Sequence, residues 1–221
     1  MPLYAKEESG RTFEPVPEGC HLAVCYGVVD LGTHVSQFKD DNGKLKESRK
    51  ALLMFELPDE RINVDRDGIP VNLPRAISKQ YTLSLHEKAA LRKDLQAWRG
   101  QAFTPEEKKA FDIEKLLGCQ CQLKVVHQMS EDHQKTYANI ASIMSVPKGV
   151  SKKGSPENLA ISWSFDDWDK TKDNSVFPEN MPEWVINKCR QSKEWNAVYD
   201  GPEDEVQRAP DDDRDDSAMP F

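Results

Sequence analysis

Lysines recur on both sides of the dipeptide Asn42-Gly43, at a spacing that could point them in one direction. Asn-Gly between two β-forming segments is typical of a two-residue hairpin turn. With that turn, Asp41 pairs with Lys44 and Lys39 pairs with Lys46, and directly paired residues share a face of the hairpin. The sequence therefore predicts an arm whose cations could follow a polyanion, formed by Lys39, Lys44, Lys46 and Lys50.

The same register pairs Val35 with Lys50 and places Phe38 and Arg49 on the opposite face, so the arm could curl around an extended chain. The alternative is a solvated hairpin whose lysines only prevent aggregation between sheet edges. We favour the binding interpretation, because four lysines stand beside the two acids Asp40 and Asp41.

Other cationic and aromatic side chains fall on the segments predicted to follow as strands. An aromatic ring can stack on a base of any sequence, which contributes roughly 1–3 kcal/mol per base. Tyr81 is in phase with Leu83 and Leu85 and could instead be core, and Tyr137 is ambiguous for the same reason. His127 is in phase with Val125, which favours a half-buried, hydrogen-bonded histidine. The candidates for nucleic-acid contact on these segments are Lys79, Tyr81, Lys124, Lys135 and Tyr137.

Catalytic arrangements are not evident in the sequence. It contains no GxxxxGK[ST] phosphate loop, no HExxH, no GxSxG and no CxxC pair. The five cysteines follow no disulfide framework, and Cys119 and Cys121 are too close for a zinc pair. We therefore expect no enzyme activity, no metal and no cofactor, with the thiols buried and reduced.

The last eleven residues, DDDRDDSAMPF (211–221), form an acidic run that ends in Met-Pro-Phe. Such charge density predicts a solvated, disordered segment. Its end can present an aromatic ring and a carboxylate to a basic, apolar pocket on another protein. The alternative is a tail that only increases solubility.

This end resembles the C-terminal tip of bacterial and phage single-stranded DNA-binding proteins, an acidic stretch closed by Phe or Pro-Phe. Arg214 and the stretch 217–219 depart from that pattern. Residues 81–103 also resemble small phage-encoded proteins of this type. The resemblance implies that the tip recruits replication and recombination enzymes and competes with DNA for the protein's own basic groove. The partner-binding residues that it implies are Asp211, Asp212, Asp213, Asp215, Asp216, Met219, Pro220 and Phe221.

Strands are predicted at 20–30, 50–57, 78–85, 119–128 and 135–146, from their β-branched and aromatic residues. The prolines and glycine of 58–77 predict a long loop. Ser84 and Glu87 form a capping box, so a helix should follow, with Leu91, Leu95 and Trp98 on one face and Gly100 at its end. A second helix is predicted from Thr104 to residue 117.

The predicted order is three strands, a helical insert and two more strands. This is the connectivity of the OB-fold, a five-stranded Greek-key barrel that binds oligonucleotides. We therefore expect a mainly β protein, and the alternative is a generic α+β sheet. The expected organisation is an OB-fold domain at 1–149, a linker and strap packed on the barrel at 150–199, and the acidic tail at 200–221. Trp163, Phe165, Trp184 and Val185 should pack back on the barrel, because too little sequence surrounds them for a separate core.

Charge is distributed unevenly over the 221 residues, whose net charge is -8. Residues 200–221 hold nine acids and two bases, so the rest is nearly neutral and local clusters decide what it binds. No signal or membrane-spanning segment is evident, which predicts a cytoplasmic protein. A homo-oligomer is compatible with the sequence. The expected function is sequence-independent coating of single-stranded DNA; the alternatives are a protein adaptor without nucleic-acid binding and an RNA-binding protein.

Overall fold

The computed structural model of the chain describes residues 14–39, 42–66, 69–131, 133–150, 154–168 and 176–199. This part of the chain holds six strands, three α-helices and one 3₁₀ helix, η1. Their bounds are β1 (Gly19–Lys39), β2 (Leu45–Arg66), β3 (Ile69–Thr82), α1 (Ala90–Arg99), η1 (Ile113–Leu116), β4 (Gln120–Met129), β5 (Thr136–Met144), β6 (Ile161–Trp163), α2 (Glu183–Arg190) and α3 (Lys193–Tyr199).

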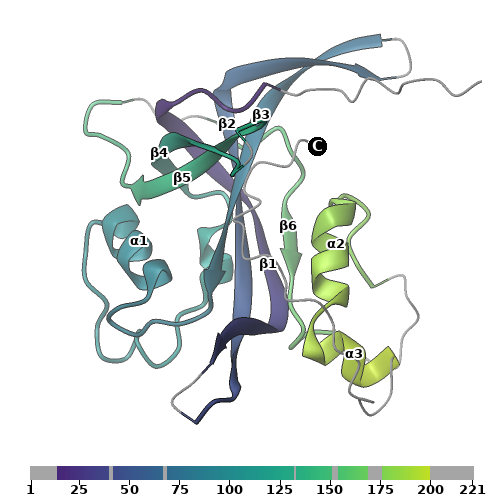
Figure 1. The fold of residues 1–221 in the computed structure, drawn as a ribbon. Coiled ribbons are helices and arrows are strands. Elements are labelled where there is room, and N and C mark those ends of the chain that lie inside the picture. The colour runs from purple at the N-terminus through teal and green to yellow at the C-terminus, as the bar shows by residue number, and fades with distance from the viewer. Residues whose placement is uncertain are drawn as a thin grey trace, which may run out of the picture.

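The strands form one sheet in the order β3-β2-β1-β4-β5, in which all neighbours are antiparallel. β6 pairs with β1 in parallel. The sheet curls into a half-barrel, because β3 and β5, the two ends of this order, approach each other (Figure 1). α1 follows β3 in the chain and packs against both β3 and β5. The prediction of a mainly β, antiparallel fold is confirmed.

β1 belongs to two parts of the molecule. Its residues 19–24 pair with β4, and 27–29 pair with β6. Its register with β2 shifts between Cys25 and Gly27 and again between Asp30 and Gly32. Such bulges bend a strand and increase its twist. The far end of β1 therefore leaves the barrel together with the start of β2.

The apolar run at 51–57 is buried on both faces of the sheet, which explains why its residues do not alternate between apolar and polar. Leu53 and Phe55 lie in a core inside the half-barrel, together with residues of α1, β4 and β5. Leu52 and Met54 lie in a second core, on the opposite face. Figure 1 accordingly shows α1 on one side of the sheet and α2 and α3 on the other.

The second core, here the outer core, joins β1 and β2 to residues 154–168 and 176–199, which we call the C-terminal cover. Four of the chain's five tryptophans belong to the cover. The cover therefore lies on the barrel, and does so by burying aromatic side chains against β1 and β2. The members of the outer core are Tyr26, Val29, Leu31, Leu52, Met54, Ile161, Trp163, Phe165, Trp168, Met181, Val185, Cys189 and Trp195.

The prediction of a loop at 58–77 is wrong. β2 and β3 continue through this region and pair as a hairpin, for example Ile62 with Leu73 and Val64 with Val71. Pro70 and Pro74 lie on β3, which has a partner on one side only among the described strands. An edge strand tolerates proline, because the missing N–H has no ladder partner to lose. Proline therefore did not mark a loop here.

The helix predicted from Thr104 is also wrong, although its capping box forms: the Thr104 N–H donates to Glu107 Oε2 at 2.9 Å and the Glu107 N–H donates to Thr104 Oγ1 at 3.2 Å. Turns follow it, then η1. Residues 104–110 carry no apolar stripe, so a helix there would have no face to bury. The predicted stripe of α1 is confirmed, since Leu91, Leu95 and Trp98 are buried, but α1 starts only at Ala90, beyond the Ser84 capping box.

The thiols fall into two groups, contrary to the expectation that all five are buried. Cys20 and Cys119 are exposed, whereas Cys25, Cys121 and Cys189 are buried. Burial raises the pKa of the Cys25 thiol to about 12 and also raises the pKa of Cys121 and Cys189. A thiol-reactive dye should therefore label two cysteines quickly in the native protein and the other three only after unfolding. Fast native labelling of Cys189 would contradict a closed cover.

Candidate nucleic-acid interface

The two strand ends that leave the barrel form a two-stranded ribbon, residues 33–39 of β1 and 45–50 of β2, which we call the arm (Figure 1). The turn at Asn42-Gly43 joins them, and Gly43 has a φ of 79°, in the left-handed region that such turns use. The expected pair of Lys44 with Asp41 involves a residue outside the described part of the chain.

The register of the arm differs from the predicted one. Val35 pairs with Glu47 rather than with Lys50, and Lys39 pairs with Leu45 rather than with Lys46. Between these two pairs β1 has three residues and β2 has one, so β1 bulges and every side chain beyond that point is shifted. The turn chemistry predicted the hairpin correctly but could not reveal the bulge.

The predicted single cationic face is therefore wrong for Lys39. Lys46 and Lys50 share a face of β2, because side chains alternate along a strand. Lys39 lies opposite Leu45, on the other face. Cations consequently border both faces of the arm.

The tip half of the arm exposes one aromatic ring and several lysine side chains to solvent. Phe38 is 64% exposed, and Lys39, Lys44 and Lys46 are exposed as well. An exposed phenyl ring and exposed ammonium groups on the same segment have the two properties that single-strand binding needs: a surface on which a base can stack and a positive charge for the phosphates. These four predicted residues all lie in the tip half of the arm, distributed over its two faces.

Arg49 and Lys50 lie at the root of the arm and have structural partners. The Arg49 guanidinium binds Asp30, with Nη2 2.6 Å from Oδ2, and Asp166, with Nη2 2.9 Å from Oδ1. The hydrogen bond to Asp30 is the main reason that the pKa of Arg49 lies above its ordinary value. Lys50 Nζ donates to Thr82 Oγ1 at 3.4 Å. The Arg49 charge is thus neutralised by the protein itself, so Arg49 is a poor candidate for a phosphate contact.

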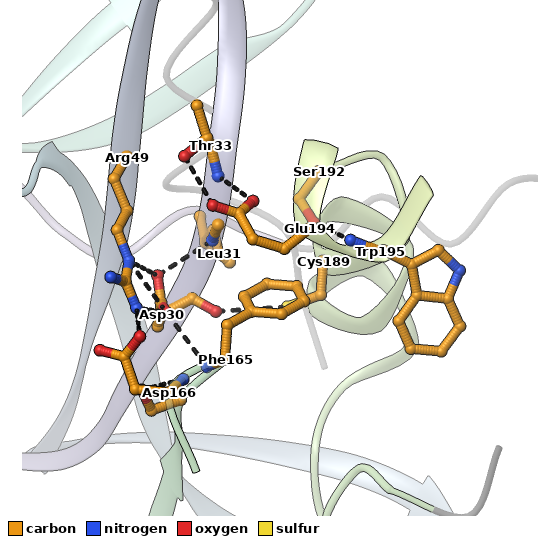
Figure 2. A network of polar contacts seen from close by, with 12 residues as sticks. Asp30, Leu31, Thr33, Arg49, Phe165, Asp166, Cys189, Ser192, Glu194 and Trp195 are labelled. Carbon is orange, nitrogen blue, oxygen red and sulfur yellow. Dashed lines mark hydrogen bonds and ion pairs between the residues drawn. The ribbon is translucent and has the colours of Figure 1, made fainter. Parts of the chain in front are cut away.

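Asp30 is the centre of a network that joins the root of the arm to the cover (Figure 2). It is 6% exposed, and its carboxylate accepts hydrogen bonds from Arg49, the Gly32 N–H at 3.0 Å and the Phe165 N–H at 3.1 Å. Its backbone carbonyl accepts from Cys189 Sγ at 3.7 Å. A buried carboxylate is tolerated because the donors from Arg49, Gly32 and Phe165 compensate its desolvation.

Glu194 completes the network from α3. Its carboxylate accepts the Thr33 N–H and the Thr33 hydroxyl, each at 2.7 Å. Burial alone would raise the pKa of Glu194, but these two hydrogen bonds lower it below its ordinary value. The Thr33 N–H, which a neighbouring strand could otherwise bind, therefore donates to the carboxylate.

Lys79 and Tyr81 do not lie on a binding surface. Asp94 of α1 accepts the Tyr81 hydroxyl at 2.7 Å and Lys79 Nζ at 3.0 Å. Tyr81 is 3% exposed and belongs to the core, as the alternative interpretation of its phase had it. Both residues stabilise the docking of α1 against β3.

Lys124, Lys135 and Tyr137 lie on the β4–β5 hairpin, where the two lysines are exposed and the tyrosine is half-buried. Lys124 is opposite Cys20, at the start of β1, whereas the arm is at its end. The predicted contacts therefore form two separate surfaces. His127 also lies on β4, and its ring Nε2 forms a hydrogen bond of 2.8 Å with the Val16 carbonyl.

The cover closes the outer face of β2. The sequence predicted that this segment packs on the barrel, but not that it occupies this face. Glu56 is 1% exposed and accepts the Glu157 N–H at 3.0 Å, the Asn158 N–H at 2.8 Å and the Asn158 side-chain amide at 2.7 Å. An acid within an apolar strand was the available signal for such an anchor. Asp30 and Glu194 were also missed, because their partners are remote in sequence.

The predicted partner-binding residues of the C-terminal tip lie outside the described part of the chain. Among the described residues, no helix has the length and apolar character needed to span a membrane. In the same part of the chain, no His, Cys, Asp and Glu side chains are grouped as ligands for a metal ion. Comparisons with protein-family models, with curated protein sequences and with solved structures found no match for this chain.

Proposed function

We propose that the chain is a single-stranded DNA-binding protein that coats unpaired strands with little sequence preference in phage replication or recombination. The observation that carries this proposal is the exposed arm, whose tip half presents Phe38, Lys39, Lys44 and Lys46 to solvent. Stacking on the ring and ion pairing with phosphates require no particular base.

The topology supports the proposal. Three antiparallel strands, a helix and two further strands curled into a half-barrel is the arrangement expected of an OB-fold, whose ligands include oligonucleotides. The connection between the first two strands is one of the elements with which OB-folds bind, and here that connection is the arm.

The bound strand would follow the arm and the β4–β5 hairpin. The face of strands two and three, which OB-folds commonly use, is obstructed here, because Leu52, Met54 and Glu56 are buried beneath the cover. Opening the cover would expose the whole outer core to water, which opposes opening strongly.

A titration tests the proposal against its alternatives. Fluorescence anisotropy of labelled oligo(dT), duplex DNA and RNA, each at two salt concentrations, should show tight, salt-sensitive binding of the single-stranded DNA. Binding of RNA alone would favour the RNA-binding alternative. Binding of none of the three would favour a protein adaptor.

Removal of residues 200–221 should raise the affinity for single-stranded DNA at low salt. This segment holds nine acids and two bases, so it should compete with the phosphates for the arm. The gain should shrink as salt screens the charges, and recruitment of partner enzymes should be lost. An unchanged affinity at low salt would contradict self-competition by the tail.

A further inference from the structure

The arm needs support that its own strands do not provide. Beyond Gly32, β1 pairs with β2 alone among the described strands. An isolated two-stranded ribbon is marginally stable in water and changes its direction easily. A binding element of this kind loses affinity if it must be ordered each time a ligand arrives.

α3 supplies that support by contacting both strands of the arm. Glu194 holds Thr33 of β1 through two hydrogen bonds of 2.7 Å (Figure 2). The neighbouring Lys193 forms an ion pair with Glu47 of β2, with Nζ 2.6 Å from Oε1. The two contacts lie on opposite strands, so together they restrain the direction of the ribbon.

The remainder of the cover fixes the point from which the arm starts. Arg49 is held by Asp30 and Asp166, and the Phe165 N–H donates to Asp30. Gly32 lies so close to the cover that a β-carbon there would be 2.5 Å from Ser192 Cβ. The root of the arm and the start of α3 are therefore packed in direct contact.

We propose that Glu194 is a positioning residue for single-stranded DNA: it sets the direction of the arm through Thr33 without touching the ligand. This inference rests on the proposed function of the arm. It makes DNA binding and the docking of α3 reciprocal, so that each stabilises the other.

The sign of the effect distinguishes positioning from electrostatics. Removing a negative charge should by itself strengthen binding of a polyanion. Glu194→Gln should instead weaken it about fivefold or more, the lower limit of a typical coupling between sites. The dependence of affinity on salt should stay the same, because the number of phosphates contacted does not change.

The matched control is Glu183→Gln. Glu183 lies on α2, carries the same charge, and is paired at 3.5 Å with Arg190 rather than with the arm. Oligo(dT) affinity is measured by anisotropy over a salt series for the full-length wild type and both variants. Amide hydrogen exchange at 33–39 and 45–50 is measured without DNA.

Lower affinity, an unchanged salt slope and faster exchange in the arm for Glu194→Gln alone would support the inference. Unchanged or increased affinity, a reduced salt slope, or equal losses in both variants would overturn it. If the wild type binds no oligonucleotide, the proposed function fails. In that case the exchange rates still decide whether Glu194 holds the arm, and unchanged rates would overturn that as well.

Discussion

Simultaneous replacement of Lys39, Lys44 and Lys46 by glutamine should lower the affinity for single-stranded DNA about hundredfold at roughly 0.1 M salt. Each phosphate contact to a single strand contributes about 0.7 to the slope of log affinity against log salt. Three lost contacts should therefore lower that slope by about 2, as measured by anisotropy with labelled oligo(dT). All three lysines are exposed, so the fold should be unaffected.

A triple variant with the same change of charge is the control. Lys108, Lys109 and Lys148 are exposed and lie on neither the arm nor the β4–β5 hairpin. Their replacement by glutamine should change the affinity and the slope much less. Equal effects of the two triple variants would show that the protein attracts DNA through its overall charge and would refute the arm as the binding element.

Gly32→Ala should lower the free energy of unfolding by about 3 kcal/mol, from backbone strain and overpacking together. The φ of Gly32 is 79°, which is unfavourable for alanine. A β-carbon would also lie 2.5 Å from Ser192 Cβ and 2.7 Å from Phe165 Cε2, so α3 and the segment around Phe165 would have to move. Urea denaturation followed by tryptophan fluorescence measures the loss.

Gly100→Ala separates the two causes. Gly100 has a φ of 69° but no atom within 4 Å of its added β-carbon. It should therefore cost about 1 kcal/mol, the backbone contribution alone. If Gly32→Ala costs no more than Gly100→Ala, the close packing of α3 against β1 is not present in solution.

Features that depend on neighbouring residues could be predicted from the sequence. The strands follow from runs of β-branched and aromatic residues, and the buried face of α1 follows from the spacing of Leu91, Leu95 and Trp98. The hairpin at Asn42-Gly43 follows from turn chemistry. Each of these patterns acts over a few residues, so the rest of the fold does not change it.

The register of the arm could not be predicted, because the bulge between Val35 and Lys39 has no turn residue to mark it. The hairpin at 58–77 was missed for a related reason. Proline is excluded from central strands but accepted on an edge, and the position of β3 at an edge depends on the order of the whole sheet. The burial of Tyr81 could not be predicted either, because a strand residue in its position could face the core or the surface.

The sequence by itself determined the central segments of five strands, the turn at Asn42-Gly43 and which side chains at the arm tip carry charge, because short-range sterics and solvation decide these properties. Only the tertiary structure decided that Arg49 is neutralised by Asp30 and that Glu194 holds Thr33, a pair separated by 161 residues. Contacts of that kind exist only after two cores have formed on opposite faces of one sheet. No local sequence pattern predicts which distant carboxylate will bind Arg49 or Thr33.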